Sequence, residues 1–129
     1  MMKKIAVIIL SMFMISSAQS QDITVPAQFP GGDSAWAIYL DTSFNTQYIR
    51  SQLTKKDLER FGSSQRVAYG FGIMPDGTIS LINIEGSVAQ PVRNEINRVL
   101  NNSPRWKPAS FNGKAVVYRK KQVSVFLFE

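Results

Sequence analysis

The sequence predicts an α+β fold in which helices pack on one face of a three-stranded antiparallel sheet. Residues 65–74 alternate between large apolar and polar or small side chains, and a Pro-Asp-Gly turn then leads to a returning strand over 78–85. An apolar stripe with helical spacing begins at Pro91, and a long strand over 114–128 follows it. This β-β-α-β core, preceded by one or two helices, would form a two-layer sandwich.

Composition limits both the size of the protein and its chemistry. The 129 residues suffice for one domain, and 44% apolar with 19% charged residues is typical of a globular protein. The chain has no cysteine and no histidine. Their absence excludes disulfides, cysteine nucleophiles, Ser-His-Asp triads and histidine metal sites. We therefore expect no metal and no cofactor.

The first 20 residues have the layout of a secretory signal peptide. Lys3 and Lys4 precede an apolar run of 11 residues over 5–15, and Ala18 and Ser20 are the small residues that a signal peptidase prefers. We expect cleavage after Ser20. The alternative is a retained membrane anchor, but a helix of this length spans only about 16 Å, whereas the bilayer core needs about 30 Å.

The charge of the exported chain argues against a nucleic-acid partner. Loss of Lys3 and Lys4 lowers the formal net charge from +6 to +4. No segment combines dense Lys and Arg with stacking aromatic residues. We expect neither nucleic acid nor a small-molecule substrate as a partner.

A short extended lead over 21–30 is expected to precede one domain over 31–129. Asp33 follows two glycines and is expected to cap a helix over 34–42. That helix would bury an aromatic-rich stripe, which consists of Trp36, Leu40 and Phe44.

The next segment, 45–64, is polar, and we expect a helix there over 55–60 that is stopped by Phe61-Gly62-Ser63-Ser64. The strand over 65–74 then begins. Its large side chains would face the core, and its small ones would face the other way. The core set is Val67, Tyr69, Phe71 and Ile73, and the small set includes Ala68, Gly70 and Gly72.

Asp76 and Gly77 are assigned to the chemistry of the hairpin turn. The returning strand over 78–85 breaks the alternation. Either it is buried on both faces or it carries a bulge, because Ile79 and Leu81 share one face while Ile82 and Ile84 share the other.

Pro91 suits the first position of a helix whose apolar stripe is Val92, Ile96, Val99 and Leu100. The helix is expected to end before Pro104. Trp106 is expected to cap the core between helix and sheet, over the small residues Ala68, Gly70 and Gly72. A turn at Asn112-Gly113 leads into the final strand.

No constellation of residues indicates an enzyme. The carboxylates are scattered in the sequence, and no spacing pairs two of them as acid and base. Without histidine or cysteine, an enzyme would need two converging carboxylates or a serine beside a buried lysine. The scattered carboxylates are Asp41, Asp57, Glu59, Glu85 and Glu95.

Five short segments, in order and spacing, together resemble one family. They are Phe29-Pro30-Gly31-Gly32, Pro75-Asp76-Gly77-Thr78-Ile79, Pro91-Val92 with Glu95, Pro104-Arg105-Trp106-Lys107-Pro108, and Asn112-Gly113-Lys114 leading into Val123-Ser124-Val125-Phe126-Leu127. The set covers about residues 26–128 and resembles the C-terminal domain of TonB, in the version common among Bacteroidetes.

The resemblance implies a periplasmic domain that binds a short segment, the TonB box, of outer-membrane TonB-dependent receptors. The segment would pair with the last strand by β-augmentation, and the chain would assist or regulate transport. The implied edge comprises Val117, Tyr118, Arg119, Lys120, Lys121, Gln122, Val123, Ser124, Val125 and Phe126. Six further residues would have structural roles, namely Trp36, Tyr69, Phe71, Asp76, Gly77 and Trp106.

The sequence departs from the family at several positions. Leu53-Thr54 replaces the usual Tyr-Pro pair, Gln65 replaces a glycine, and Gln122 replaces a proline of the last strand. The lead before Phe29 is also too short for a proline-rich spacer, since about nine residues reach only about 30 Å. A chain with a cleaved signal would have no anchor through which to transmit force.

Three other interpretations stay open. The scaffold can serve a different envelope ligand, such as peptidoglycan or another envelope protein, through an exposed aromatic or basic groove. The edge strand can instead pair with a second copy. The charge run over 119–121 can meet an acidic ligand, or it can be a solvated run that protects the edge from aggregation.

Overall fold

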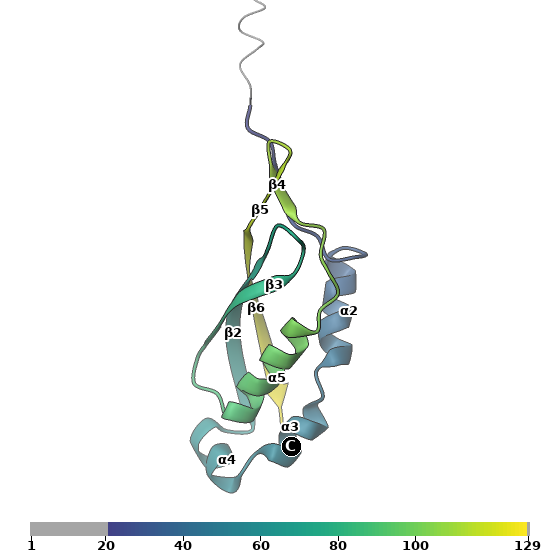
Figure 1. The fold of residues 1–129 in the computed structure, drawn as a ribbon. Coiled ribbons are helices and arrows are strands. Elements are labelled where there is room, and N and C mark those ends of the chain that lie inside the picture. Colours follow the sequence, from purple (N-terminus) through teal and green to yellow (C-terminus); the bar gives the residue numbers. More distant parts are fainter. Residues whose placement is uncertain (1–20, 129) are drawn as a thin grey trace, which may run out of the picture.

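The computed structural model describes residues 21–128, so the predicted signal peptide lies outside the described residues. Within this range the protein is an α+β domain with four helices and two three-stranded antiparallel sheets (Figure 1). No helix in the described range has the length and apolar character that a bilayer crossing requires. The helices are α2 (Asp33–Ser43), α3 (Thr46–Gln52), α4 (Lys55–Phe61) and α5 (Gln90–Asn101).

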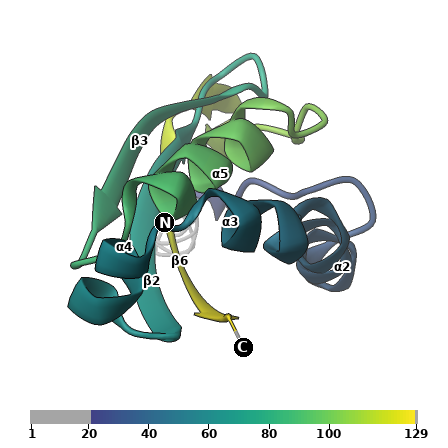
Figure 2. The same cartoon turned by 90° about the horizontal axis from the view of Figure 1, so that it is seen from below.

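The larger sheet has the strand order β3-β2-β6 and carries most of the core. Its strands are β2 (Ser64–Ile73), β3 (Ile79–Glu85) and β6 (Tyr118–Leu127). β6 pairs with β2 without interruption, from Ser64 opposite Leu127 to Ile73 opposite Tyr118. Both α5 and α2 lie on one side of this sheet, and α2 lies beside β6, on the side away from β2 (Figures 1 and 2).

The structure confirms the alternation along β2. Tyr69, Phe71 and Ile73 are completely buried, and the predicted stripe of α5 packs against them. Five aromatic rings fill the space between α2 and the sheet, with neighbouring centroids 4.8–6.2 Å apart. They are Phe29, Trp36, Tyr39, Phe71 and Trp106.

A bulge explains the broken alternation of β3. The register with β2 shifts between Gly70 and Gly72, and Leu81 has a φ of 54°. The extra residue moves Ile79, Ile82 and Ile84 to the core side, where they pack against the buried cluster. Leu81 lies on the opposite face over Gly72, where an added Cβ would be 3.1 Å from its side chain.

The predicted final strand over 114–128 is wrong in one respect, because it is two strands in two sheets. β5 (Lys114–Val116) pairs with β4 (Ala109–Phe111), which pairs with β1 (Thr24–Val25). The pairing of β6 with β2 ends at Tyr118 because β2 ends at Ile73. The chain before Val117 therefore closes its own hairpin with β4. The lead over 21–30 is accordingly paired within the fold.

Three further expectations need correction. The N-cap of α2 is Gly32 rather than Asp33, because a tight turn from Phe29 brings the helix start forward. Helix α3 was not predicted, since it buries only Ile49. Trp106 packs on the core face against Phe71 rather than over Ala68, Gly70 and Gly72, which lie on the opposite face.

The sequence prediction of α4 agrees with its observed ends. Thr54 and Asp57 form a capping box at its start, and Gly62 ends it with a φ of 84°.

Candidate functional site

β6 forms one edge of the larger sheet, and its backbone alternation shows which groups are free. The amide of Phe128 donates to the carbonyl oxygen of Ser63 at 2.7 Å, in the same register as the β2–β6 ladder. Neighbouring residues of an antiparallel strand direct their backbone groups to opposite sides. Even-numbered residues of β6 therefore bond to β2. The odd-numbered ones direct N–H and C=O away from the sheet, and they are Arg119, Lys121, Val123, Val125 and Leu127.

No strand of the described range pairs with this outer side of β6. A groove of about 450 Å³ lies there instead, between β6 and α2. Its lining from α2 and the following turn is Ala37, Leu40, Asp41, Phe44 and Thr46, and its lining from β6 is Gln122, Ser124, Val125, Phe126 and Leu127. An unpaired edge beside a groove is the geometry that accepts an extended chain.

Gln122 ties the two walls of the groove together. The indole nitrogen of Trp36 on α2 donates to the side-chain oxygen of Gln122 at 3.2 Å. Phe44 adds an edge-to-face contact with Phe126, with ring centroids 5.1 Å apart. Gln122 therefore fixes α2 beside the edge strand.

The outer face of β6, opposite the helices, has two halves of different character. Its first half carries Arg119 and Lys121, and Lys121 reaches across Gly70 to Glu85, with 3.6 Å between Nζ and Oε2. Its second half is apolar and exposed, with Val123, Val125 and Leu127 44–59% accessible.

Tyr69 and Ser124 form a partly buried polar pair where β2 meets β6. The hydroxyl groups of Tyr69 and Ser124 are 2.8 Å apart. Burial raises the pKa of the Tyr69 hydroxyl, and the hydrogen bond with Ser124 opposes this shift. The pair satisfies both hydroxyls beneath the groove.

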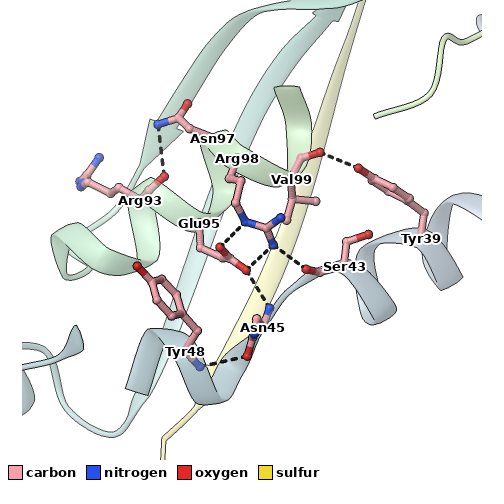
Figure 3. Close-up of polar contacts among 9 residues, drawn as sticks. All are labelled: Tyr39, Ser43, Asn45, Tyr48, Arg93, Glu95, Asn97, Arg98 and Val99. Carbon is pink, nitrogen blue, oxygen red and sulfur yellow. Dashed lines mark hydrogen bonds and ion pairs between the residues drawn. The ribbon is translucent and has the colours of Figure 1, made fainter. Parts of the chain in front are cut away.

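An ionic clamp fixes the turn between α2 and α3 to helix α5 (Figure 3). The buried carboxylate of Glu95 accepts hydrogen bonds from Arg98 at 2.7 and 2.8 Å and from the amide of Asn45 at 2.7 Å. Arg98 also donates to the carbonyl oxygen of Ser43 at 2.8 Å. The hydrogen bonds from Arg98 hold the pKa of Glu95 below its usual value, against the effect of burial.

The clamp also lines a second groove, of about 570 Å³, with Tyr48 on its rim. Glu95 is the single carboxylate among the residues that line it. Because all its strong hydrogen bonds are to groups of the fold, Glu95 is a structural residue. Nowhere in residues 21–128 do three or more acidic side chains gather as a metal site would require.

The structure brings most of the predicted edge residues together on one strand. Residues 118–126 all belong to β6, whereas Val117 lies between β5 and β6. Phe126 is buried, as are five of the six residues assigned structural roles, namely Trp36, Tyr69, Phe71, Gly77 and Trp106. Asp76 accepts hydrogen bonds from the amide and hydroxyl of Thr78 in the turn, which lower its pKa.

Sequence reasoning missed the α2 wall of the groove and the reason for Gly77. Ala37 and Asp41 lie outside the apolar stripe of α2, and nothing in the sequence indicates that β6 lies beside them. Residue 77 must lack a side chain because the backbone of Trp106 lies against it. The amide of Trp106 donates to the carbonyl oxygen of Gly77 at 2.9 Å.

Comparison with known proteins gives no family assignment. No protein-family model matches the chain, and no curated protein matches it either.

Proposed function

We propose that this protein is a TonB C-terminal-like interaction domain of the periplasm, which binds an extended segment of an outer-membrane receptor by strand addition to β6. In this role it would assist or regulate TonB-dependent transport. The observation that carries the proposal is the outer edge of β6. Its backbone groups have no partner strand in the described range, and they lie beside the groove between β6 and α2, called the β6 groove below.

The position of α2 favours a single peptide strand over a second copy. An added strand continues the sheet beside β6, and α2 then covers one of its faces (Figure 2). A second domain paired symmetrically on the same edge would bring its own α2 to the same side of the sheet. The two helices would then compete for one space.

A different envelope ligand, such as peptidoglycan, is the alternative proposal. Its best support is the second groove, which exposes Tyr48 (56% accessible) close to Arg98. Few donors are left there for a ligand, because the guanidinium of Arg98 already donates hydrogen bonds to Glu95 and Ser43.

An NMR titration tests the proposal. The isotope-labelled chain from Gln21 onward, which contains every described element, is titrated with TonB-box peptides of receptors from the same organism. Shifts concentrated on residues 118–127 support strand addition. Shifts confined to the groove at Tyr48 and Arg98, or no shifts at millimolar peptide, contradict it.

A pair of proline variants provides the matched control. Val125→Pro removes an N–H that faces outward, whereas Ser124→Pro removes one that bonds to β2. Val125→Pro should therefore weaken peptide binding in a folded domain. Ser124→Pro should unfold or strongly destabilise the domain itself.

A further inference from the structure

The α2 wall of the β6 groove carries one charge that the stability of the fold does not explain. Of the residues lining that groove, Asp41 alone is charged, and its side chain is exposed. The two ion pairs among residues 21–128 are Glu95–Arg98 and Lys121–Glu85, so neither uses Asp41.

Asp41 is also in an unfavourable place for a carboxylate. It lies in the last turn of α2, which ends at Ser43, and no basic residue accompanies it there. A negative charge at a helix C-terminus is repelled by the helix dipole, and aspartate is a weak helix former. Residues that conflict with local stability concentrate at functional sites.

The geometry of strand addition gives Asp41 a ligand. Side chains of an added strand alternate between the two faces of the sheet, so every second one enters the groove beneath α2. Most of the groove lining is apolar or neutral, with Ala37, Leu40 and Phe44 on the helix side. A cationic side chain entering there has one anionic partner among the lining residues, the carboxylate of Asp41.

We propose that Asp41 determines specificity at the β6 edge by selecting an extended peptide with lysine or arginine at a groove-facing position. This inference rests on the proposed function, since it requires that a strand pairs with β6. It assigns the two faces of the ligand different chemistry. The groove face carries the cation, and the open face lies along Arg119, Lys121 and the apolar half of β6.

The test uses three capped nine-residue peptides of alternating threonine and valine that differ only at the central residue, which is lysine, glutamine or glutamate. Each is titrated by NMR into the wild-type chain, Asp41→Asn, Asp41→Lys and Glu59→Gln. Glu59 is exposed on α4 and outside the β6 groove, so its variant removes one negative charge without touching the site.

For the wild type and Glu59→Gln, we expect the lysine peptide to bind about threefold tighter than the glutamine peptide and the glutamate peptide about threefold weaker, as for a partly screened ion pair. Asp41→Asn should remove this order, and Asp41→Lys should reverse it. If β6 amides shift but the order is the same in Asp41→Lys, the role of Asp41 is overturned while strand addition stands. If no peptide shifts the β6 amides, both proposals fail.

Discussion

The indole nitrogen of Trp36 donates a hydrogen bond to the side-chain oxygen of Gln122, and this contact joins helix α2 to the edge strand β6. Trp36 is 4% exposed, so its N–H has little access to water. Without the acceptor, the buried donor would lose its partner.

Gln122→Ala should therefore lower the free energy of unfolding by about 1 kcal/mol. Urea denaturation of both proteins measures the difference. Gln122→Glu keeps an acceptor oxygen at this position and is the matched control. Equal destabilisation by both variants would show that the hydrogen bond is not the cause.

Hydrogen exchange should alternate along β6. The amides of Lys120, Gln122, Ser124 and Phe126 bond to β2 and should exchange slowly. Those of Lys121, Val123 and Val125 point away from β2 at the open edge and should exchange much faster in the free protein. Amide-resolved exchange by NMR checks this, and uniform protection along the strand would mean that the outer edge is covered.

Replacing Gly77 and Gly113 in turn distinguishes two ways in which an added side chain destabilises the fold, namely backbone strain and steric overlap. Both have positive φ, 88° and 83°, but an added Cβ at Gly77 overlaps the carbonyl oxygen of Trp106, whereas none of the described atoms lies within 4 Å of one at Gly113. We expect Gly113→Ala to cost about 1 kcal/mol from backbone strain alone. Gly77→Ala should cost about 2–4 kcal/mol because the backbone at Trp106 must also move.

Thermal or urea denaturation of the two glycine variants gives both values. A similar loss in each would contradict the contact between the turn and Trp106.

The Glu95 clamp should make stability depend on pH. The pKa of Glu95 in the folded protein lies below its ordinary value of 4.5. The clamp therefore stabilises the fold fully above the unfolded pKa, and this contribution is lost as the pH falls through the lower, folded pKa. Glu95→Gln should cost about 1–2 kcal/mol at neutral pH, because Arg98 and Asn45 lose a charged acceptor.

Denaturation curves at neutral and acidic pH test this. The difference between wild type and Glu95→Gln should shrink toward low pH. A difference that stays constant from neutral to acidic pH would show that the carboxylate charge does not matter.

The sequence predicts those elements whose side chains carry a local pattern. β2 and α5 are evident because one face of each is completely buried, and the Pro75–Gly77 turn has its own chemistry. The division of the last strand at Val117 could not be predicted, since residues 114–127 contain no strand breaker. It depends on where β2 ends.

The candidate site also has a part that the sequence predicts and a part that it does not. The edge residues of β6 follow from the final strand and the family resemblance. The wall provided by Ala37 and Asp41 depends on how α2 packs through Trp36, which is a tertiary contact between distant segments. No local sequence pattern in α2 predicts that contact.

The uninterrupted pairing of β2 with β6 also constrains when the chain can fold. β2 is the central strand of the larger sheet, and its second partner, β6, follows every other described strand in the sequence. Until β6 emerges, the β2–β3 hairpin has only one strand pair, and isolated hairpins are marginally stable in water. Pairing between segments far apart in the sequence is also slow. A chain in which β6 is not yet available would thus stay largely unfolded over the segments that form the larger sheet.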